Sequence, residues 1–243
     1  MARFFVEAAD MQGEKLYLTG ENADHAKVLR LKPGEEVLVC DGCGQECRCS
    51  VLELHDREVI LQVLERCESK AEPGVQVRVY MAFPKADKLE HVIQKATELG
   101  AFEIIAFPSS RCISKPDEKS LKKKLERWQK IAASAAEQSG RGRIPQIRVL
   151  SSYQQALQEA AQADMPLMFY ENERATTLQM TLKSGSYRTV SLLTGPEGGL
   201  EPTEVEQAAE AGLRICTLGR RILRCETAPL CALSAVMYDA GEF

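Results

Sequence analysis

The stretch LLTGPEGGL at residues 192–200 decides the fold that we predict for this chain. The apolar run TVSLL (189–193) leads into it, and the helix-like run TEVEQAAEAG (203–212) follows. A glycine-rich turn at the carboxyl end of a parallel strand is where open α/β sheets bind ligands. Its glycines let the backbone approach a ligand closely, although a plain tight turn fits the spacing equally well. The Lys-Ser/Thr pair of a triphosphate-binding loop is absent, which disfavours that class of site.

A second loop, LGRRILRCETAPL (218–230), also follows a strand-like run, LRICTL (213–218). Three arginines cluster in it, and the apolar pair Ile222 and Leu223 interrupts them. Thr227 is a reasonable N-cap for a helix opened by Pro229. Two such loops at neighbouring strand ends predict a ligand pocket between them.

The chain from residue 75 onward alternates strand-like and helical patterns. Two helices are expected, at 86–99 and at about 117–139, each with apolar residues on one face. Strand patterns separate the helical ones, which predicts a largely parallel α/β sheet. The expected strands are VQVRVYMA (75–82), FEIIAF (102–107), IRVL (147–150), PLMFY (166–170), TVSLL and LRICTL.

The first 66 residues are β-rich instead, with one helix expected at 22–30. Several short strands bounded by Gly, Pro or Asp suggest a small barrel, and ESKAEPG (68–74) makes a plausible linker. We therefore predict an N-terminal domain at 1–70 and a C-terminal domain at 74–243. The expected strands are RFFV (3–6), KLYL (15–18), EVLVCD (36–41), CRCSVLEL (47–54) and REVILQV (57–63).

The 243 residues carry a net charge of −4 that is unevenly distributed. Residues 1–72 have net charge −6, residues 73–143 have +6, and residues 144–243 have −4. A basic middle third fits a phosphate-rich partner, but a solvated helix face explains it at least as well. There is no long apolar run and no signal-peptide core, so we expect a cytoplasmic protein without a membrane span.

Nine cysteines, an odd number, argue against a disulfide framework. Cys40, Cys43, Cys47 and Cys49 crowd together, but the second half-site of a zinc knuckle is missing at the usual spacing. Ordinary strand and turn cysteines are the favoured interpretation, and no metal is expected. The three histidines belong to no hydrolase motif.

Five segments, taken in order, resemble the RsmE family, the bacterial 16S ribosomal RNA uracil-N3 methyltransferases. RFFV and HAKVLRLKPGEEV (25–37) are similar to the N-terminal domain of that family. Cys225 is a departure, because the family usually has Thr there, and we expect any hydroxyl hydrogen bond to be lost. The five segments are KADKLEHVIQKATELG (85–100), SSRCISK (109–115), RWQKIAASAAEQSGRGRIP (127–145), TGPEGGL (194–200) and LGRRILRCETAPL.

The resemblance implies an α/β fold: a C-terminal SPOUT domain with a deep trefoil knot, preceded by a small PUA-like β-barrel. It also implies a homodimer, 16S rRNA or the small ribosomal subunit as substrate, and S-adenosylmethionine as methyl donor. The implied cofactor-binding residues lie in the two loops: Leu193, Thr194, Gly195, Pro196, Glu197, Gly198, Gly199, Leu218, Gly219, Ile222, Leu223, Arg224 and Cys225.

Methylating N3 of uracil requires loss of its proton while negative charge spreads over O2 and O4. We predict that Arg224 stabilises this charge and that Glu226 is a base or orients Arg224. Predicted RNA contacts are Lys85, Lys88, Arg111, Gln138, Arg141, Arg143, Arg3, Lys27 and Arg30, with Arg141 and Arg143 as mobile loop cations.

Other functions remain open from the sequence. A related knotted methyltransferase acting on another RNA, such as a transfer RNA ribose, would have the same cofactor loops. A non-catalytic RNA-binding or ribosome-assembly protein is an alternative from a different functional class. The presence of both loops in this chain argues against it. A plain nucleotide-binding module is a weaker hypothesis, because the residues of a phosphate-binding loop are absent.

Overall fold

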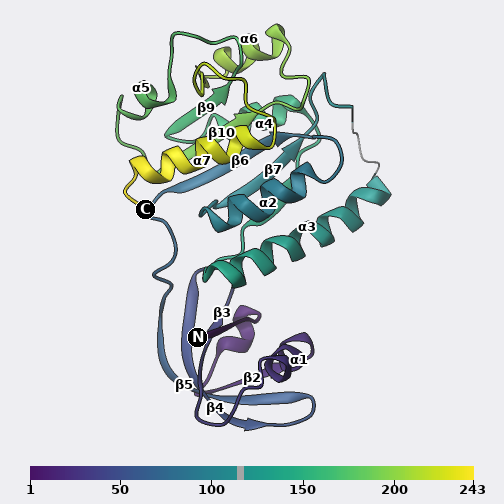
Figure 1. The fold of residues 1–243 in the computed structure, drawn as a ribbon, viewed down its shortest axis with the longest axis vertical. Helices are drawn as coiled ribbons and strands as arrows, with labels where there is room; N and C mark the ends of the chain where they lie inside the picture. Colours follow the sequence, from purple (N-terminus) through teal and green to yellow (C-terminus); the bar gives the residue numbers. More distant parts are fainter. Residues whose placement is uncertain (114–117) are drawn as a thin grey trace. The chain divides into compact units, whose positions relative to one another are not determined.

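The computed structural model describes residues 1–113 and 118–243, which form two compact units (Figure 1). The N-terminal unit holds residues 1–72 and 136–144, and the C-terminal unit holds residues 73–135 and 145–243. Residues 136–144 fall within the predicted C-terminal domain at 74–243. This segment joins the first unit through tertiary contacts, which no local pattern reveals.

A five-stranded sheet forms the N-terminal unit, with strand order β1-β3-β4-β5-β2. β1 pairs with β3 in parallel, and the other pairs are antiparallel. Alternate residues of the strands face the core, so that Leu16 and Leu18 of β2 are buried while their neighbours are exposed. The strands are β1 Ala2–Phe5, β2 Lys15–Thr19, β3 Glu36–Cys40, β4 Gln45–Leu54 and β5 Glu58–Glu68, joined by a 3-10 helix at Ala8–Met11 and by α1 at Glu21–Val28.

The clustered cysteines belong to this sheet. Cys40, Cys47 and Cys49 are buried strand residues, and Cys43 is exposed in the turn between β3 and β4. This arrangement agrees with the interpretation as ordinary strand and turn cysteines. Within residues 1–113 and 118–243, no group of three or more His, Cys, Asp or Glu residues is placed to hold a metal ion.

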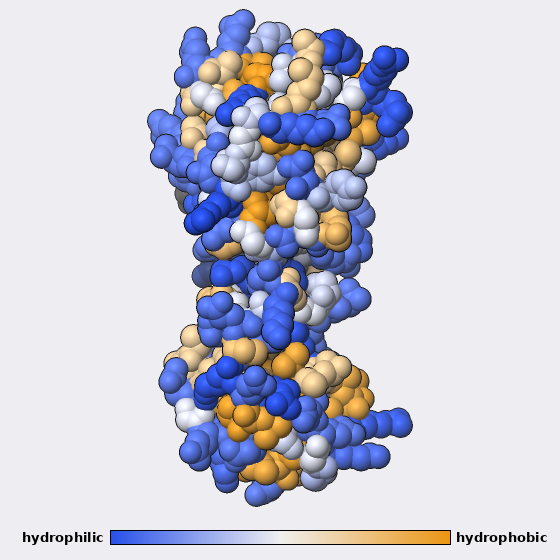
Figure 2. Space-filling view, turned by 90° about the vertical axis from the view of Figure 1, so that its left-hand side faces the viewer, coloured by the Kyte–Doolittle hydropathy of each residue, from blue (hydrophilic) through white to orange (hydrophobic). Residues whose placement is uncertain are grey.

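Some large apolar side chains of the N-terminal unit remain exposed, including Tyr17, Val28, Leu29, Leu52 and Leu64. Figure 2 shows apolar side chains gathered on the face of this unit that it presents. Exposed apolar groups that lie together mark surfaces that contact other molecules.

The C-terminal unit contains a six-stranded sheet in which every neighbouring pair is parallel, with strand order β11-β9-β10-β6-β7-β8. The predicted parallel sheet is therefore confirmed. β10 lies between β6 and β9, two strands that precede it in the chain. The implied trefoil knot stays a prediction. The strands are β6 Gln76–Ala82, β7 Glu103–Phe107, β8 Gln146–Val149, β9 Met165–Phe169, β10 Thr189–Thr194 and β11 Arg214–Cys216.

Helices cover both faces of this sheet. The helix α7 packs on β6 and β10 and against α2, and α4 also packs on β6 and β10. Full burial of β7 and β9 follows from coverage on both sides. No helix in the described part of the chain is long and apolar enough to cross a bilayer. The helices are α2 Lys88–Glu98, α3 Glu118–Ser139, α4 Tyr153–Ala160, α5 Leu178–Leu182, α6 Pro202–Glu210 and α7 Thr227–Asp239.

The predicted start of α7 differs from the structure. Thr227 is the first residue of α7 rather than its N-cap, because the amides of Thr227 and Ala228 both donate to the carbonyl of Arg224. Glu226 takes the N-cap position without a side-chain capping bond. The expected start of α3 at about residue 117 lies outside the described residues.

Candidate functional site

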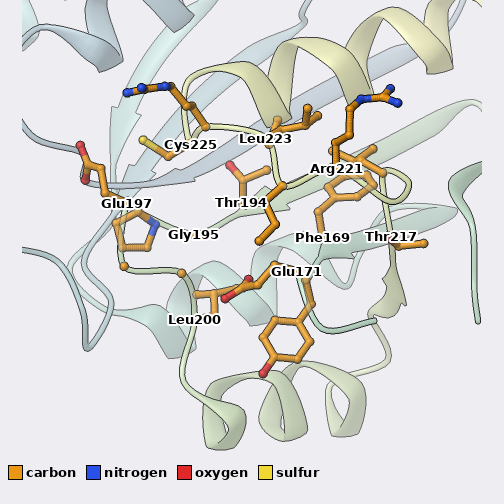
Figure 3. A pocket seen from close by; sticks show the side chains of 18 of the residues that line it. Phe169, Glu171, Thr194, Gly195, Glu197, Leu200, Thr217, Arg221, Leu223 and Cys225 are labelled. Atoms are coloured by element: carbon orange, nitrogen blue, oxygen red, sulfur yellow. The ribbon is translucent and has the colours of Figure 1, made fainter. Parts of the chain in front are cut away.

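A cavity of about 450 Å³ lies where β9, β10 and β11 end in the C-terminal unit (Figure 3). The three strands are neighbours in the sheet, so the loops that follow them meet at one edge. Glu197 and Cys225 lie on one side of the cavity, and Phe169 and Thr217 lie on the other (Figure 3). This is the ligand-binding position predicted for an open parallel sheet.

The turn after β10 forms one wall, and its glycines leave no room for side chains. A Cβ on Gly195 would stand 3.0 Å from Leu200 Cγ and 3.1 Å from the Gly199 carbonyl carbon. Gly199 adopts a positive φ of 68°, and a Cβ there would overlap the Glu171 carboxylate. The turn thus exposes bare backbone to the cavity.

The loop after β7 holds this turn in place through hydrogen bonds. Arg111 donates from Nη1 to the carbonyl of Gly198 at 2.9 Å and from Nε to Glu201 Oε1 at 3.0 Å. The Ser110 amide donates to the buried Glu204 of α6 at 2.8 Å. Glu204 also completes a capping box with Glu201, so the turn and the start of α6 are held together.

The loop after β11 forms the opposite wall. Thr217 Oγ1 accepts from the Gly219 amide at 3.2 Å and donates to the Gly219 carbonyl at 3.1 Å, which closes a tight turn. Gly219 has a φ of 107°, a conformation that favours glycine. Ile222 is 77% exposed although it lines the cavity, so an apolar surface is available to a ligand.

Lys88, from the first turn of α2, joins the two cavity loops electrostatically. Its Nζ lies 3.0 Å from Glu197 Oε1 and 3.4 Å from Glu226 Oε2. Cys225 Sγ lies 3.8 Å from the same Nζ, and its thiol donates to Glu226 Oε2 at 3.2 Å. Cys225 thus makes a hydrogen bond of its own to Glu226, from a weak sulfur donor, and the expected loss of a hydroxyl hydrogen bond stays a prediction.

These contacts set the protonation of the cluster. Burial acts to raise the pKa of Glu197, but its bonds from the Lys85 amide, its own amide and Lys88 leave that pKa below its usual value. The pKa of Glu226 is likewise lowered, against burial, by its own amide, Cys225 and Lys88. Contact with Glu197 raises the pKa of Lys88. Burial and the bond to Glu226 raise the pKa of Cys225 to about 12.

The structure brings nearly all of the predicted cofactor residues together. Each of them lines the cavity except Leu193, which is fully buried inside β10. The loop after β9 was not among the predicted cofactor residues, although its polar run ENER (171–174) follows a buried strand and was a usable signal. The lining residues outside the predicted set are Lys88, Phe169, Tyr170, Glu171, Arg174, Leu200, Thr217, Arg221 and Ala228.

The two predicted catalytic residues lie in different surroundings. Arg224 is exposed at the cavity, and its guanidinium has no ion-pair partner within residues 1–113 and 118–243. The Glu226 carboxylate faces Lys88 and Cys225. In this structure Glu226 is thus placed to hold Lys88 rather than to orient Arg224.

The predicted RNA contacts are placed very differently from one another. The prediction that Arg141 is a mobile loop cation is wrong. Its side chain is 4% exposed, and its Nη2 lies 2.7 Å from Glu72 Oε2. Arg143 also is held, since it donates to the Cys43 carbonyl. Arg3 pairs with Glu46 at 2.9 Å in a mostly buried position.

The remaining members of that set divide between the two units. In the C-terminal unit Lys88 lines the cavity and Arg111 buttresses its wall, while Lys85 is exposed. In the N-terminal unit Lys27, Arg30 and Gln138 are exposed. Exposed cations are therefore available for phosphate in both units.

Known proteins resemble the chain over both units. Residues 71–237 match the family described as an RNA methyltransferase domain, and residues 18–64 match an RNA methyltransferase PUA domain. The ribosomal RNA small subunit methyltransferase E of Bacillus subtilis is 39% identical, over 98% of this chain and 97% of its own length.

Solved structures agree with this similarity. The ribosomal RNA small subunit methyltransferase E of Neisseria gonorrhoeae, bound to S-adenosyl methionine, is 33% identical with a TM-score of 0.83, and the match covers 98% of this chain and 97% of that one. A Legionella pneumophila structure with bound SAM is 29% identical with a TM-score of 0.84, covering 97% and 96%. The chain belongs to the RNA methyltransferase family of ribosomal RNA small subunit methyltransferase E, with a PUA domain at its N-terminal end.

Proposed function

We propose that this protein transfers a methyl group from S-adenosylmethionine to N3 of a uridine in 16S ribosomal RNA. The observation that carries the proposal is the cavity formed by two glycine-containing loops at adjoining strand ends, in a chain of this family. The relatives named above act, by their names, on small-subunit ribosomal RNA or bind S-adenosylmethionine. We further propose the assembled small subunit as substrate, a homodimer as the active form, and action in the cytoplasm.

The residues of the cavity fit this cofactor. Its volume of about 450 Å³ suits a small molecule. The glycines of the turn at Gly195 and Gly199 let the backbone approach a base closely, and Ile222 and Leu223, which line the cavity, offer apolar surface to its faces. When bound there, S-adenosylmethionine supplies an activated methyl group.

Arg224 is proposed as the catalytic cation. The target uracil must leave its stack before N3 is accessible. Loss of the N3 proton places negative charge on O2 and O4, and an arginine that forms no ion pair with any residue the structure describes is available to stabilise that charge. We assign Glu226 a positioning role, because its lowered pKa makes it a weaker base than an ordinary carboxylate. Glu226 and Glu197 both pair with Lys88, and this shared cation holds the two cofactor loops in a fixed position relative to each other.

Calorimetric titration with S-adenosylmethionine followed by a methyl-transfer assay tests this function. We expect one cofactor site per chain, and 3-methyluridine in digests of 30S subunits analysed by mass spectrometry. Absence of binding at millimolar cofactor would leave the non-catalytic RNA-binding function as the better explanation. Cofactor binding with methyl transfer to transfer RNA instead would point to a different substrate.

Replacing Arg224 with alanine should abolish methyl transfer and leave cofactor affinity nearly unchanged. The reason is that Arg224 acts on charge that develops on the uracil, while we expect the cofactor to be held largely through backbone groups of the two loops. Arg221→Ala is a matched control, because Arg221 lies in the same loop and also lines the cavity. An active Arg224→Ala enzyme would refute the assignment.

A further inference from the structure

Glu171 lines the cavity with a carboxylate that makes no hydrogen bond or ion pair in the described part of the chain. It is the second residue after β9, at the carboxyl end of that strand. Glu197, the other acidic residue in the cavity lining, instead accepts from the Lys85 amide at 2.9 Å and pairs with Lys88 at 3.0 Å. Glu171 is therefore the carboxylate of this lining that is available to a ligand.

The surroundings of Glu171 fix where its carboxylate lies. A Cβ built on Gly199 would overlap this carboxylate, so the group lies directly against the glycine turn after β10. Figure 3 shows Glu171 between Leu200 and Phe169. Because β9 lies between β10 and β11 in the sheet, Glu171 enters the cavity between the two loops that form its walls. A ligand that contacts both loops would present its middle part to Glu171.

The neighbouring charges favour a neutral hydrogen-bond donor over a cationic one as the partner of Glu171. The bond to Glu201 is the largest cause of the raised pKa of Arg111, and the charge of Glu171 also contributes to it. Glu171 is therefore near a guanidinium that partly balances its charge, and a second cation would meet repulsion there. Cationic side chains also outnumber acidic ones in the cavity lining: Lys88, Arg174, Arg221 and Arg224 against Glu171 and Glu197.

We propose that Glu171 binds the two ribose hydroxyls of S-adenosylmethionine. The inference deepens the proposed function, on which it rests for the identity of the ligand. An ionised carboxylate only accepts hydrogen bonds, and its two oxygens match two neighbouring hydroxyl donors. The ribose is the middle part of this cofactor, between the base and the methionine group, as the position of Glu171 requires. In other open α/β sheets a carboxylate near a strand end binds a ribose hydroxyl in the same way.

Calorimetric titration of the whole chain with S-adenosylhomocysteine and its 2′-deoxy and 3′-deoxy analogues tests this assignment. In the wild type, removal of either hydroxyl should weaken binding about tenfold, because a hydrogen bond to a charged acceptor is lost. Glu171→Ala should weaken the binding of S-adenosylhomocysteine by at least about tenfold and should bind all three compounds equally, because the partner of the hydroxyls is gone. Glu171→Gln keeps one acceptor oxygen and should lose less affinity.

Glu173→Gln is the matched control for charge and for loop structure. Glu173 is two residues further along the same loop and is outside the cavity lining. Its Oε1 accepts from the amides of Ala175 and Thr176 at 2.7 and 2.9 Å, and glutamine retains an oxygen at this position. This variant should therefore distinguish the ribose compound from its deoxy analogues as well as the wild type does. Melting curves followed by circular dichroism verify that each variant is folded.

5′-Methylthioadenosine distinguishes the ribose from the ammonium group, because it keeps the ribose and lacks the amino-acid part. Glu171→Ala should lose as much affinity for it as for S-adenosylhomocysteine. A loss confined to S-adenosylhomocysteine would overturn the proposal in favour of the ammonium group. Equal discrimination against the deoxy analogues in the wild type and in Glu171→Ala would overturn it as well.

Two further outcomes separate this assignment from the proposed function. A wild-type protein that binds none of these compounds refutes both. A wild-type protein that shows the expected discrimination, and loses it in Glu171→Ala, but transfers no methyl group to 30S subunits refutes the proposed function and leaves the role of Glu171 standing.

Discussion

Replacing Arg141 with alanine should destabilise the N-terminal unit rather than weaken RNA binding directly. Arg141 and Glu72 are 4% and 17% exposed, and their side chains meet at 2.7 Å. Removing one partner of a buried ion pair costs about 3–5 kcal/mol, because the other charge is left without compensation. The Glu72 carboxylate keeps its bonds from the amides of Gly142 and Arg143, each 3.0 Å long. We therefore expect the lower end, about 3 kcal/mol.

Urea unfolding followed by circular dichroism measures this loss, and hydrogen exchange locates it. Amides in the segment 136–144 should exchange faster in Arg141→Ala, since Glu72 accepts hydrogen bonds from the Arg141 side chain and from the amides of Gly142 and Arg143 in this segment. Arg48→Ala is the control, because Arg48 is an exposed cation between Glu36 and Glu65 and its loss should change stability little.

A double variant makes the test sharper. Removing Glu72 as well as Arg141 takes away the uncompensated charge, so the combined loss should be smaller than the sum of the two single losses. An Arg141→Ala protein with wild-type stability, wild-type exchange and weakened RNA binding would refute the reasoning. It would also restore Arg141 as the phosphate contact that the sequence analysis predicted.

Two further changes test the cavity. Gly199→Ala should weaken S-adenosylmethionine binding about tenfold, roughly 1.4 kcal/mol, because the new Cβ would displace Glu171 and the turn. Gly212→Ala is the control, because Gly212 also has a positive φ but has open space around it. This variant should lose stability without losing cofactor affinity. Calorimetry decides, and equal affinities in the two variants would contradict the close-approach argument. Cys225 should resist iodoacetamide until the pH nears its pKa of about 12, while the exposed Cys43 reacts first. Because folding raises that pKa, the contribution of the protonated thiol to stability is full below pH 9 and is lost as the pH rises through about 12. Rapid alkylation of Cys225 at pH 8, located by peptide mass spectrometry, would show that the Cys225 thiol is accessible to solvent and not buried.

Much of the fold could be predicted because its signals are local. Alternation along β2 and helical spacing along α2 report which side of each element is buried. The loops at 194–199 and 218–225 stood out because each follows a strand and contains residues suited to close backbone approach. Their meeting in one cavity needed only the rule that parallel strands end at the same edge.

The partners of charged residues could not be predicted in the same way. Lys88 has the helical position of a solvent-exposed cation, yet it lines the cavity between Glu197 and Glu226. The loop after β9 contributes Glu171 because β9 lies between β10 and β11 in the sheet, a strand order that no local pattern contains. Arg30 had the sequence of an ordinary basic residue, and only the backbone of the folded chain places it at a left-handed position.

The sequence by itself determined the parallel α/β sheet, the β-rich N-terminal unit, the two loops that line the cavity and the family. These follow from periodicity, turn chemistry and motifs, which act over a few residues. Only the tertiary structure decided which charges are free and which are bound. Arg141 and Glu72 are 69 positions apart, and Lys88 and Glu226 are 138 apart, so each pairing is set by how the chain folds back on itself. Electrostatic attraction depends on distance in space and on burial, and neither can be read from neighbours along the chain.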